Sequence, residues 1–483
     1  MIEKLLLFGA TGDLASRFLL PALAELYDEG ALPDGFCVVG AAIEDWDDET
    51  FRHHAARQLE QHAATDVSAA SREALVRSLR YRRVDFDDEG SVAEAVEEAS
   101  GGAVAGEQAE PVAAYLALPA AVFAPAVSAL GAAGLPSGSR IVLEKPFGED
   151  LDSAVELNRL LARVTGVAGE RGIFRVDHAL GMATVQNLLA ARLTNRVLEP
   201  VWNSTHIEQI DILWDETLAL EGRASYYDRT GALEDVIQNH LLQVLCLIAM
   251  EPPVSLSERD LRDRKIDVLR SVRPLTSEEV VSRTRRARYT AGKLASTGGA
   301  DGQAVPDYAE EEGVDPQRGT ETFAEVVLEL ESWRWSGTHF LLRTGKALAR
   351  RRKEAVVRFR PVPYLPFDDA EPAANELRIG LDGPYDLVLL LTGMASGPPP
   401  HLAPLVLDAE LSAPERPAYS RVLVDILKGE GILSIRGDEA EEAWRVLTLV
   451  LQAWADDRVP LEEYPAGSAG PPPLDAAAHG STS

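Results

Sequence analysis

The 483-residue chain is too long for one ordinary hydrophobic core, so two or three domains are expected. Its 46% hydrophobic and 26% charged residues are typical of a globular protein in water. A formal net charge of −30 excludes non-specific nucleic-acid binding, because such binding needs a basic surface. Any anionic ligand must therefore be held by a local basic pocket against an unfavourable overall field.

Cysteine content and the length of apolar runs predict a cytoplasmic protein with no membrane partner. Cys37 and Cys246 lie in apolar runs, which favours buried thiols in a reducing compartment over a disulfide framework. The apolar part of the N-terminus, MIEKLLLFGA, is too short for a signal peptide. We find no apolar stretch that approaches the roughly 20 residues of a bilayer-spanning helix.

Strand-like and helix-like segments alternate over the first part of the chain. This alternation predicts right-handed crossover units and a parallel sheet, as in a Rossmann domain over residues 1–176. The expected strands are residues 4–8, 36–42, 81–86, 112–118 and 140–148.

After about residue 177 the pattern changes to long alternating strands with a helix at 232–250. We expect an α+β domain over residues 177–466, with a large, mainly antiparallel sheet. Residues 291–318 are expected to form a long loop, and the tail 467–483 is expected to be disordered. The strands of this sheet are expected within residues 204–216, 322–332, 338–345, 354–361, 375–381 and 385–393.

A glycine-rich turn, GATGDLASR at residues 9–17, follows the first strand and opens a helix. Gly9 and Gly12 allow the backbone to approach a pyrophosphate at the positive helix N-terminus. The G-x-x-G spacing alone is weak, but its place inside a βαβ pattern favours nucleotide binding. The end of the second strand offers Ile43 and Glu44 with no arginine before Arg52, which favours NAD over NADP. Alternatively, these acids only begin the next helix.

Longer motifs recur along almost the whole chain. They include FGATGDLA at 8–15, YLALP at 115–119, EKPFG at 144–148, RVDH at 175–178 and DVIQNHLLQVLCLIAMEPP at 235–253. TETFAEVVLELESWRW at 320–335, LRTGKAL at 342–348 and EYPAGS at 463–468 follow. In these motifs the chain resembles the glucose-6-phosphate dehydrogenase family.

The resemblance implies an NAD(P)-dependent oxidoreductase that oxidises C1 of a hexose to a lactone. It assigns His240 as the general base and Asp177 as the carboxylate that orients it. From spacing alone, His240 shares a helical face with Val236, Ile237 and Val244, as a core histidine would.

The resemblance also assigns binding residues. Glu216 and Asp235 match acceptors for sugar hydroxyls, Lys145 matches a lysine between cofactor and substrate, and Lys346 matches a cation at the sugar phosphate. From the residues alone, the two acids could face solvent and Lys145-Pro146 could be a turn. The cofactor-binding residues expected from the turn, the second strand and the matched motifs are Gly9, Thr11, Gly12, Asp13, Leu14, Ile43, Glu44, Leu118, Pro119 and Lys145.

The chain departs from the family beside His178. The family has tyrosine and lysine at the positions of Ala179 and Met182, and these side chains grip the substrate phosphate together with the matched histidine. Loss of the lysine contact removes a charge-assisted hydrogen bond of about 1.5–3 kcal/mol. The family also has lysine and arginine at the positions of Ser16 and Ile43, which again favours NAD over NADP here.

These departures predict an altered substrate: an unphosphorylated, amino or nucleoside-linked sugar. In the alternatives, Met182 merely packs on a helix face and the chain is a glucose-6-phosphate 1-dehydrogenase of low efficiency, or the chain is a non-catalytic, nucleotide-binding regulatory homologue. No metal site is expected. The basic run at 346–361 is interpreted as an exposed strand face, or as a contact to a nucleotide or another subunit. The resemblance implies that the domain at 177–466 binds the substrate and mediates oligomerisation, so a homodimer or homotetramer is expected.

Overall fold

The computed structural model describes residues 1–101, 109–220, 224–295, 302–367, 372, 374–383, 385–396, 401–411 and 416–474, in two compact units. Unit 1 comprises Met1–Gly181, Val254–Arg262 and Pro414–Glu441, and unit 2 comprises Met182–Pro253, Asp263–Ala413 and Glu442–Ser483. Two short segments from the second half of the chain therefore belong to the N-terminal unit. The domains drawn from the sequence, 1–176 and 177–466, stay a prediction.

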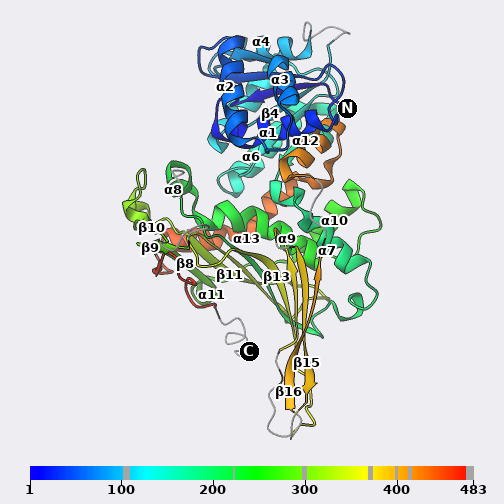
Figure 1. Cartoon of the computed structure of the whole chain (residues 1–483), viewed down its shortest axis with the longest axis vertical. Coiled ribbons are helices and arrows are strands. Elements are labelled where there is room, and N and C mark those ends of the chain that lie inside the picture. Colours follow the sequence, from blue (N-terminus) through cyan, green and yellow to red (C-terminus); the bar gives the residue numbers. More distant parts are fainter. Residues whose placement is uncertain are drawn as a thin grey trace. The chain divides into compact units, whose positions relative to one another are not determined.

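The described part of unit 1 contains a seven-stranded sheet in the order β17-β6-β5-β4-β1-β2-β3 (Figure 1). All neighbouring strands run parallel except β17, which pairs antiparallel with β6. The sequence-predicted parallel sheet is confirmed, but two of its strands, β6 and β17, are not among the strands expected from the sequence. The strands are β1 (Lys4–Phe8), β2 (Cys37–Ala42), β3 (Leu79–Arg83), β4 (Val112–Leu116), β5 (Arg140–Glu144), β6 (Ile173–Val176) and β17 (Ser434–Ile435).

Helices connect the strands of unit 1, and their N-terminal capping residues show why they begin where they do. The Asp47 carboxylate accepts a hydrogen bond from the Thr50 amide, and Asp150 forms a capping box with Ser153. The first helix begins at Asp13 and continues as a π-helical turn, η1 (Ala15–Leu19). The other helices are α1 (Leu20–Asp28), α2 (Asp48–His62), α3 (Ala69–Ser78), α4 (Glu89–Ser100), α5 (Phe123–Ala133), α6 (Leu151–Thr165) and α12 (Ala418–Lys428), with the 3₁₀ turns η2 (Ala120–Val122), η3 (Gly166–Gly172), η4 (His178–Gly181) and η9 (Gly431–Leu433).

In unit 2, the described ranges form a nine-stranded sheet in the order β16-β15-β14-β13-β7-β12-β11-β8-β18 (Figure 1). Its pairs are antiparallel except β12 with β7 and β18 with β8. The predicted fold class, a Rossmann domain followed by an α+β domain with a mainly antiparallel sheet, is confirmed. The strands are β7 (Ile207–Asp215), β8 (Thr284–Thr290), β11 (Phe323–Glu329), β12 (His339–Gly345), β13 (Arg352–Phe359), β14 (Glu376–Gly380), β15 (Asp386–Ala395), β16 (His401–Glu410) and β18 (Leu461–Pro465).

A long apolar helical run, Tyr227–Ala249, crosses unit 2. It has 23 residues, and its most apolar 18-residue window has a mean hydropathy of 1.2, which meets the length and composition of a membrane span, but that window is 89% buried in the protein. The expectation that no apolar stretch approaches membrane-span length is therefore wrong, because this core helix does. The helices of unit 2 are α7 (Ala183–Leu193), α8 (Ala224–Ala232), η6 (Leu233–Leu241), α9 (Leu242–Ala249) and α11 (Ser277–Arg283), with the turns η5 (Glu199–Val201), η7 (Tyr308–Glu310) and η8 (Pro316–Arg318); α10 (Glu258–Ser271) and α13 (Gly437–Ala455) contain residues of both units.

Two segments that were expected to lack regular structure, residues 291–318 and the tail, contain ordered parts. Residues 291–318 include the hairpin of β9 (Gly292–Leu294) and β10 (Gln303–Val305), so the expected long loop is interrupted. In the tail, the Gly467 amide donates to the Ala347 carbonyl, and the Leu474 amide donates to Glu325. Residues 467–474 are therefore hydrogen-bonded to other parts of unit 2, and the expectation of disorder is not met for them. Residues 475–483 lie outside the described residues.

The basic run at 346–361 is exposed in part: Arg350, Arg351 and Arg360 are exposed, and the residues of β13 (Arg352–Phe359) are buried or half-buried. Several of its cations form ion pairs with acids on the sheet, so the surplus positive charge is neutralised locally. The pairs include Arg351 and Lys353 with Asp382, Arg352 with Asp215, and Arg358 with Asp211.

The thiols behave as the sequence predicts. Cys246 is buried and Cys37 is half-buried, and neither forms a disulfide among the described residues. A cytoplasmic location stays a prediction.

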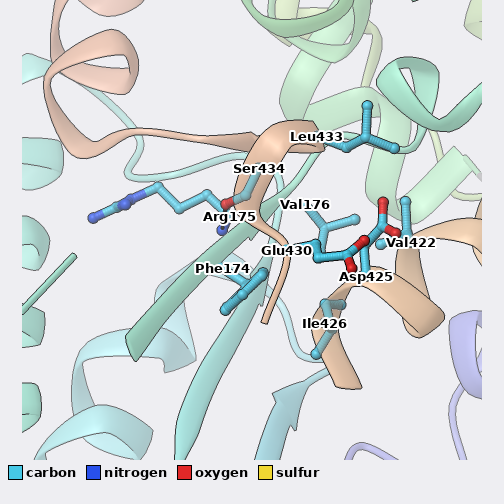
Figure 2. Close-up of a pocket in the computed structure, with 9 residues that line it drawn as sticks. All are labelled: Phe174, Arg175, Val176, Val422, Asp425, Ile426, Glu430, Leu433 and Ser434. Carbon is cyan, nitrogen blue, oxygen red and sulfur yellow. Dashed lines mark hydrogen bonds between the residues drawn. The ribbon is translucent and has the colours of Figure 1, made fainter. Parts of the chain in front are cut away.

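A small cavity in unit 1 lies between β6, α12 and the η9–β17 segment (Figure 2). Its volume of about 10 Å³ holds at most one water molecule, so it is too small for a sugar or a nucleotide. Asp425 lines it with Glu430 and the apolar Val176, Val422 and Ile426. Burial, together with the neighbouring Glu430 charge, raises the pKa of Asp425 from 3.8 to about 6.

Replacing Asp425 by asparagine is expected to stabilise unit 1 above pH 6. The folded state binds the proton more tightly than the unfolded chain, so ionisation destabilises the fold fully above pH 6 and not at all below pH 3.8. The full shift corresponds to an upper limit of about 3 kcal/mol, and screening of this partly exposed group reduces it to about 1 kcal/mol. Thermal melts at pH 7.5 and pH 4.5 check this, with the exposed Asp34→Asn as control. An equal gain at both pH values would contradict the assignment.

Candidate active site

The glycine-rich turn lies at the carboxyl end of β1, where the sequence predicts the cofactor. Gly9 has a φ of +71°, and a Cβ there would lie 2.2 Å from the Ala117 carbonyl oxygen, so only glycine fits. A helical hydrogen bond from the Ser16 amide to the Gly12 carbonyl, 3.0 Å long, follows at once. The predicted residues Asp13 and Leu14 form the first helical positions. A helix therefore starts beside the last strand residue, which is the arrangement that accommodates a dinucleotide pyrophosphate.

Glu44 is held at the end of β2 by the same turn. The Thr11 hydroxyl donates to its carboxylate at 3.0 Å, and the Tyr81 hydroxyl donates to its carbonyl at 2.8 Å. Ile43 beside it is 65% exposed. An ordered carboxylate at this place suits a free ribose diol. The side chain of Arg83, on β3, donates to the Ile43 carbonyl at 3.3 Å, and sequence reasoning missed this nearby cation because it lies on another strand.

The motifs YLALP and EKPFG follow β4 and β5, so Leu118, Pro119 and Lys145 share the carboxyl edge of this sheet with the turn. The Lys145–Pro146 peptide bond is cis. Just before it, the buried Glu144 accepts a 2.5 Å hydrogen bond from the Tyr115 hydroxyl. Burial raises the pKa of Glu144 to about 7.

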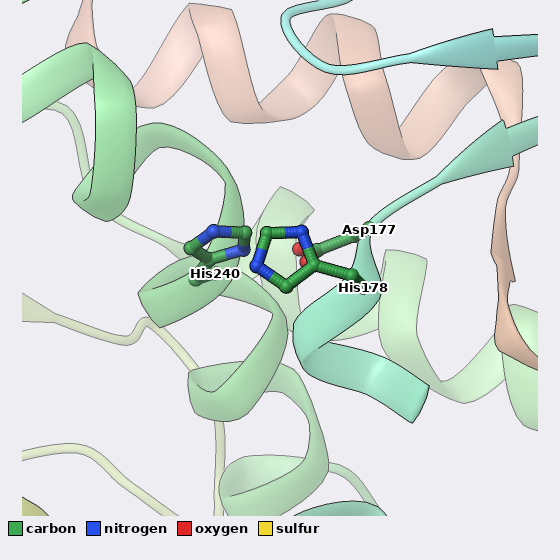
Figure 3. Close-up of side chains that lie close together, drawn as sticks. All are labelled: Asp177, His178 and His240. Carbon is green, nitrogen blue, oxygen red and sulfur yellow. The ribbon is translucent and has the colours of Figure 1, made fainter. Parts of the chain in front are cut away.

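Asp177 and His178 follow β6 on the same edge of unit 1 (Figure 3). Asp177 is fully buried, and its Oδ1 accepts the Ala179 amide at 2.9 Å. His178 stacks on Tyr419, with ring centroids 5.3 Å apart. Ala179 is buried and Met182, the residue before α7, is half-buried.

In unit 2, Glu216 and Lys346 follow the neighbouring parallel strands β7 and β12, and their side chains meet at 2.7 Å. Burial acts to raise the pKa of Glu216, but the Lys346 ammonium outweighs it and leaves that pKa below its ordinary value. The negative charge of Asp235 acts on the same carboxyl. The predicted sugar-binding residues of unit 2 are therefore neighbours.

His240 lies on the π-helical segment η6 (Figure 3) and is 4% exposed. Its ring stacks on Trp214 with centroids 5.5 Å apart. The Lys353 ammonium lies over the Trp214 ring, 4.0 Å from the ring centroid. Burial lowers the pKa of this lysine. Short π-helical segments within helices are frequent at functional sites, and the spacing of apolar residues gives no sign of one.

Sequence reasoning missed four side chains around the predicted residues. Trp214 and Lys353 face each other across β7 and β13, so only strand register could have found them. The ring centroid of Tyr227 lies 5.0 Å from the Lys346 ammonium. Tyr419 lies 241 residues from the His178 that it contacts.

The chain was compared with known proteins. Residues 6–187 match the NAD-binding domain of glucose-6-phosphate dehydrogenase, and residues 189–482 match its C-terminal domain. A glucose-6-phosphate 1-dehydrogenase of Mycolicibacterium smegmatis is 40% identical, with 98% of this chain and 94% of the relative covered. One of Treponema pallidum is 37% identical, with 99% and 93% covered.

Solved structures agree. The crystal structure of glucose-6-phosphate 1-dehydrogenase from Mycobacterium avium has a TM-score of 0.83 at 32% identity, covering 98% of this chain and 96% of that one. A glucose-6-phosphate dehydrogenase in complex with glucose-6-phosphate has a TM-score of 0.84 at 29% identity, covering 97% and 95%. The resemblance found in the sequence motifs is thus confirmed over the full length. The chain belongs to the glucose-6-phosphate dehydrogenase family and is an NAD(P)-dependent oxidoreductase that acts on CH–OH groups.

Proposed function

We propose that the chain oxidises C1 of glucose 6-phosphate to the lactone, with a weaker hold on the phosphate than the family pattern gives. The observation that carries the proposal is the retained polar group of unit 2, in which Glu216 contacts Lys346 at the end of β7, the strand whose Trp214 stacks on His240 of η6. The full-length relatives, all glucose-6-phosphate 1-dehydrogenases, support this substrate over the altered sugar that the sequence placed first.

In this mechanism His240 removes the proton from the O1 hydroxyl as the C1–H bond breaks. Asp177 fixes the imidazole orientation and stabilises its charged form. A bound nicotinamide supplies the hydride acceptor, so the C1–H electron pair leaves as hydride and the O1–H electron pair becomes the carbonyl bond of the lactone. Asp177 belongs to unit 1 and His240 to unit 2, and their pairing rests on the family resemblance.

The sugar is held by groups with unlike charges. Glu216 and Asp235 accept hydrogen bonds from sugar hydroxyls, and Lys346 contacts the phosphate while it neutralises Glu216. Lys145 stands between cofactor and sugar. The family holds the phosphate with a tyrosine, a lysine and a histidine at these positions. Because residues 179 and 182 are alanine and methionine here, His178 is what this chain retains of that set.

A second candidate is favoured by these same two residues. A site without the tyrosine and the lysine accepts an uncharged or bulkier group at C6, so an unphosphorylated, amino or nucleoside-linked sugar would suit it. Initial rates of nicotinamide reduction with glucose 6-phosphate, glucose, glucosamine and a nucleoside-linked glucose distinguish the two. Preference for glucose 6-phosphate supports the first proposal, and preference for another sugar supports the second. If no sugar is oxidised, both are wrong and a non-catalytic, nucleotide-binding role remains.

We also propose that NAD is preferred over NADP. The carboxylate of Glu44 is positioned by Thr11 to accept hydrogen bonds from the ribose diol, and it repels a 2′-phosphate. Glu44→Ser is expected to lower kcat/KM for NAD by about ten-fold and to raise it for NADP, since a hydrogen bond to a charged group is lost. Steady-state kinetics with both cofactors check this, and the exposed Asp45→Ser is the matched control. A preference for NADP in the unmodified chain would contradict the assignment. It would indicate that the nearby Arg83 binds the 2′-phosphate.

We propose further that the chain forms a homodimer or homotetramer through the large sheet of unit 2. β16 is an edge strand, and its Leu405, Val406 and Leu407 are each more than 40% exposed on a ribbon with β15 that extends beyond the other strands (Figure 1). Replacing Leu405 and Leu407 together by glutamate is expected to reduce the mass in light scattering to 52.2 kDa, the mass of one chain. Asp408→Asn is the control, and a monomeric unmodified chain would contradict the proposal.

A further inference from the structure

We propose that Glu321 is a positioning residue for the sugar-binding groups of unit 2. Its buried carboxylate fixes the start of η6, the helical segment that bears Asp235 and His240, relative to the segment that bears Lys346. In this role Glu321 contacts neither the sugar nor the cofactor. The inference rests on the proposed function and adds a residue that lies outside the assigned site.

Glu321 caps the start of η6 from a distant part of the chain. It lies two residues before β11 and is only 9% exposed. Its Oε1 accepts a hydrogen bond from the Leu233 amide at 2.9 Å, and its carbonyl oxygen accepts one from the Ala232 amide at 3.1 Å. Leu233 is the first residue of η6, where amides have no partner within their own helix. The carboxylate satisfies this donor and places a negative charge at the positive end of the helix.

A kink at Gly231 makes this cap necessary. Gly231 has a φ of +70° and a ψ of 177° within the helical run, so the helical geometry of α8 is broken there and starts again at η6. A Cβ on Gly231 would lie 2.8 Å from the carboxylate carbon of Glu321, so the backbone of the kink and the carboxylate are in direct contact. Gly231 and Glu321 together therefore fix the direction in which η6 leaves α8.

The residues on either side of Glu321 connect the same segment to α8 and to Lys346. The Thr320 hydroxyl donates to the Asp228 carbonyl at 2.7 Å. The Lys346 amide donates to the Thr322 carbonyl at 2.9 Å. Residues 320–322 therefore hold α8 and η6 through one set of hydrogen bonds and the Lys346 backbone through another. The distance between the two sugar-binding elements is set by this segment.

The cap acts mainly on Asp235. Asp235 follows Leu233 by two residues in the first turn of η6, and its charge acts on Glu216. His240 lies five residues further along and stacks on Trp214, so it is held by a contact of its own. Loss of the cap is therefore expected to weaken sugar binding more than it slows removal of the O1 proton.

Glu321→Leu keeps much of the bulk of the side chain and removes the acceptor. Burial raises the pKa of Glu321 to about 7, so kinetics at pH 8 report on the ionised carboxylate. We expect KM for glucose 6-phosphate to rise about ten-fold and kcat to fall less than three-fold. Glu321→Gln keeps an acceptor oxygen, so its KM is expected to stay within three-fold of that of the unmodified chain. An equal rise in KM for both variants, or a fall in kcat at unchanged KM, would overturn the proposal.

Glu325→Leu is the matched control, because it removes a second buried carboxylate four residues further along the chain. Burial also raises the pKa of Glu325 to about 7, and Glu325 accepts the Leu474 amide instead of an amide of η6. This variant is expected to lower Tm and to leave KM and kcat unchanged. If Glu325→Leu raised KM as much as Glu321→Leu, the effect would come from lost stability and the proposal would be wrong.

A second background tests whether the cap acts through Asp235. In Asp235→Ala no carboxylate remains to be positioned, so the addition of Glu321→Leu is expected to change KM less than two-fold. A ten-fold effect in both backgrounds would show that Glu321 acts independently of Asp235 and would overturn the proposal.

Two measurements without turnover separate this inference from the proposed function. The amides of η6 are expected to exchange with deuterium faster in Glu321→Leu than in the unmodified chain, and not in Glu321→Gln. In calorimetric titration, binding of glucose 6-phosphate without turnover contradicts the proposed function alone, and Glu321→Leu is then expected to weaken that binding about ten-fold. Unchanged exchange over η6, or failure of glucose 6-phosphate to bind the unmodified chain, overturns the inference as well.

Discussion

Replacing His240 by asparagine is expected to lower kcat for sugar oxidation by about 10²- to 10⁴-fold, the range of a general base. Asparagine keeps a polar side chain of similar reach but cannot accept the O1 proton. Because the cofactor turn lies in unit 1, the dissociation constant for NAD is expected to change less than two-fold. Stopped-flow reduction of the nicotinamide and fluorescence titration of the cofactor measure the two quantities.

The matched control is His401→Asn, an exposed histidine of β16 in the same unit as His240. It is expected to leave kcat unchanged. If His240→Asn retained more than a tenth of the turnover, the imidazole would be a core residue that packs on Trp214, as the apolar spacing around it allows.

Restoring both family side chains, Ala179→Tyr with Met182→Lys, is expected to raise kcat/KM for glucose 6-phosphate by about ten- to a hundred-fold. The lysine adds a charge-assisted hydrogen bond to the phosphate, worth about 1.5–3 kcal/mol, and the tyrosine adds a neutral one. Glucose has no phosphate, so its kcat/KM is expected to change less than three-fold. Initial-rate measurements over a range of both sugars give the comparison.

Met182→Leu is the control for a change of shape without charge at this position. A lysine immediately before α7 opposes the helix dipole at a cost of about 0.3–1 kcal/mol, so a thermal melt must show that the double variant is folded. A folded double variant with no gain for glucose 6-phosphate would show that positions 179 and 182 do not contact the substrate phosphate.

The fold was largely readable from the sequence because both sheets follow a simple alternation of apolar residues. The strands at 4–8 and 112–118 are short and, apart from Lys4, apolar throughout, as buried parallel strands require. The sequence does not predict β17, because the strand has only two residues and pairs with β6 through tertiary contacts. The β9–β10 hairpin was missed because its strands are three residues long and rich in small residues.

The sequence predicts residues of the candidate site only where they lie in contiguous motifs. Glu44 was found because it ends a strand, and the structure adds the Thr11 hydrogen bond that orders it. Arg83, Lys353 and Tyr419 were not found, because strand pairing and helix packing bring them in from distant segments. The π-helical geometry around His240 also has no local sequence signal.

Transfer of the C1 hydrogen to the nicotinamide is the step that defines the proposed reaction, and deuterium at C1 follows it directly. The chain is incubated with NAD and with glucose 6-phosphate that carries deuterium at C1. The mass of the reduced cofactor is then measured by mass spectrometry. We expect reduced cofactor that is heavier by one mass unit, together with the lactone or the acid formed by its hydrolysis. Reduced cofactor without deuterium, or none at all with either NAD or NADP, would contradict the proposed reaction.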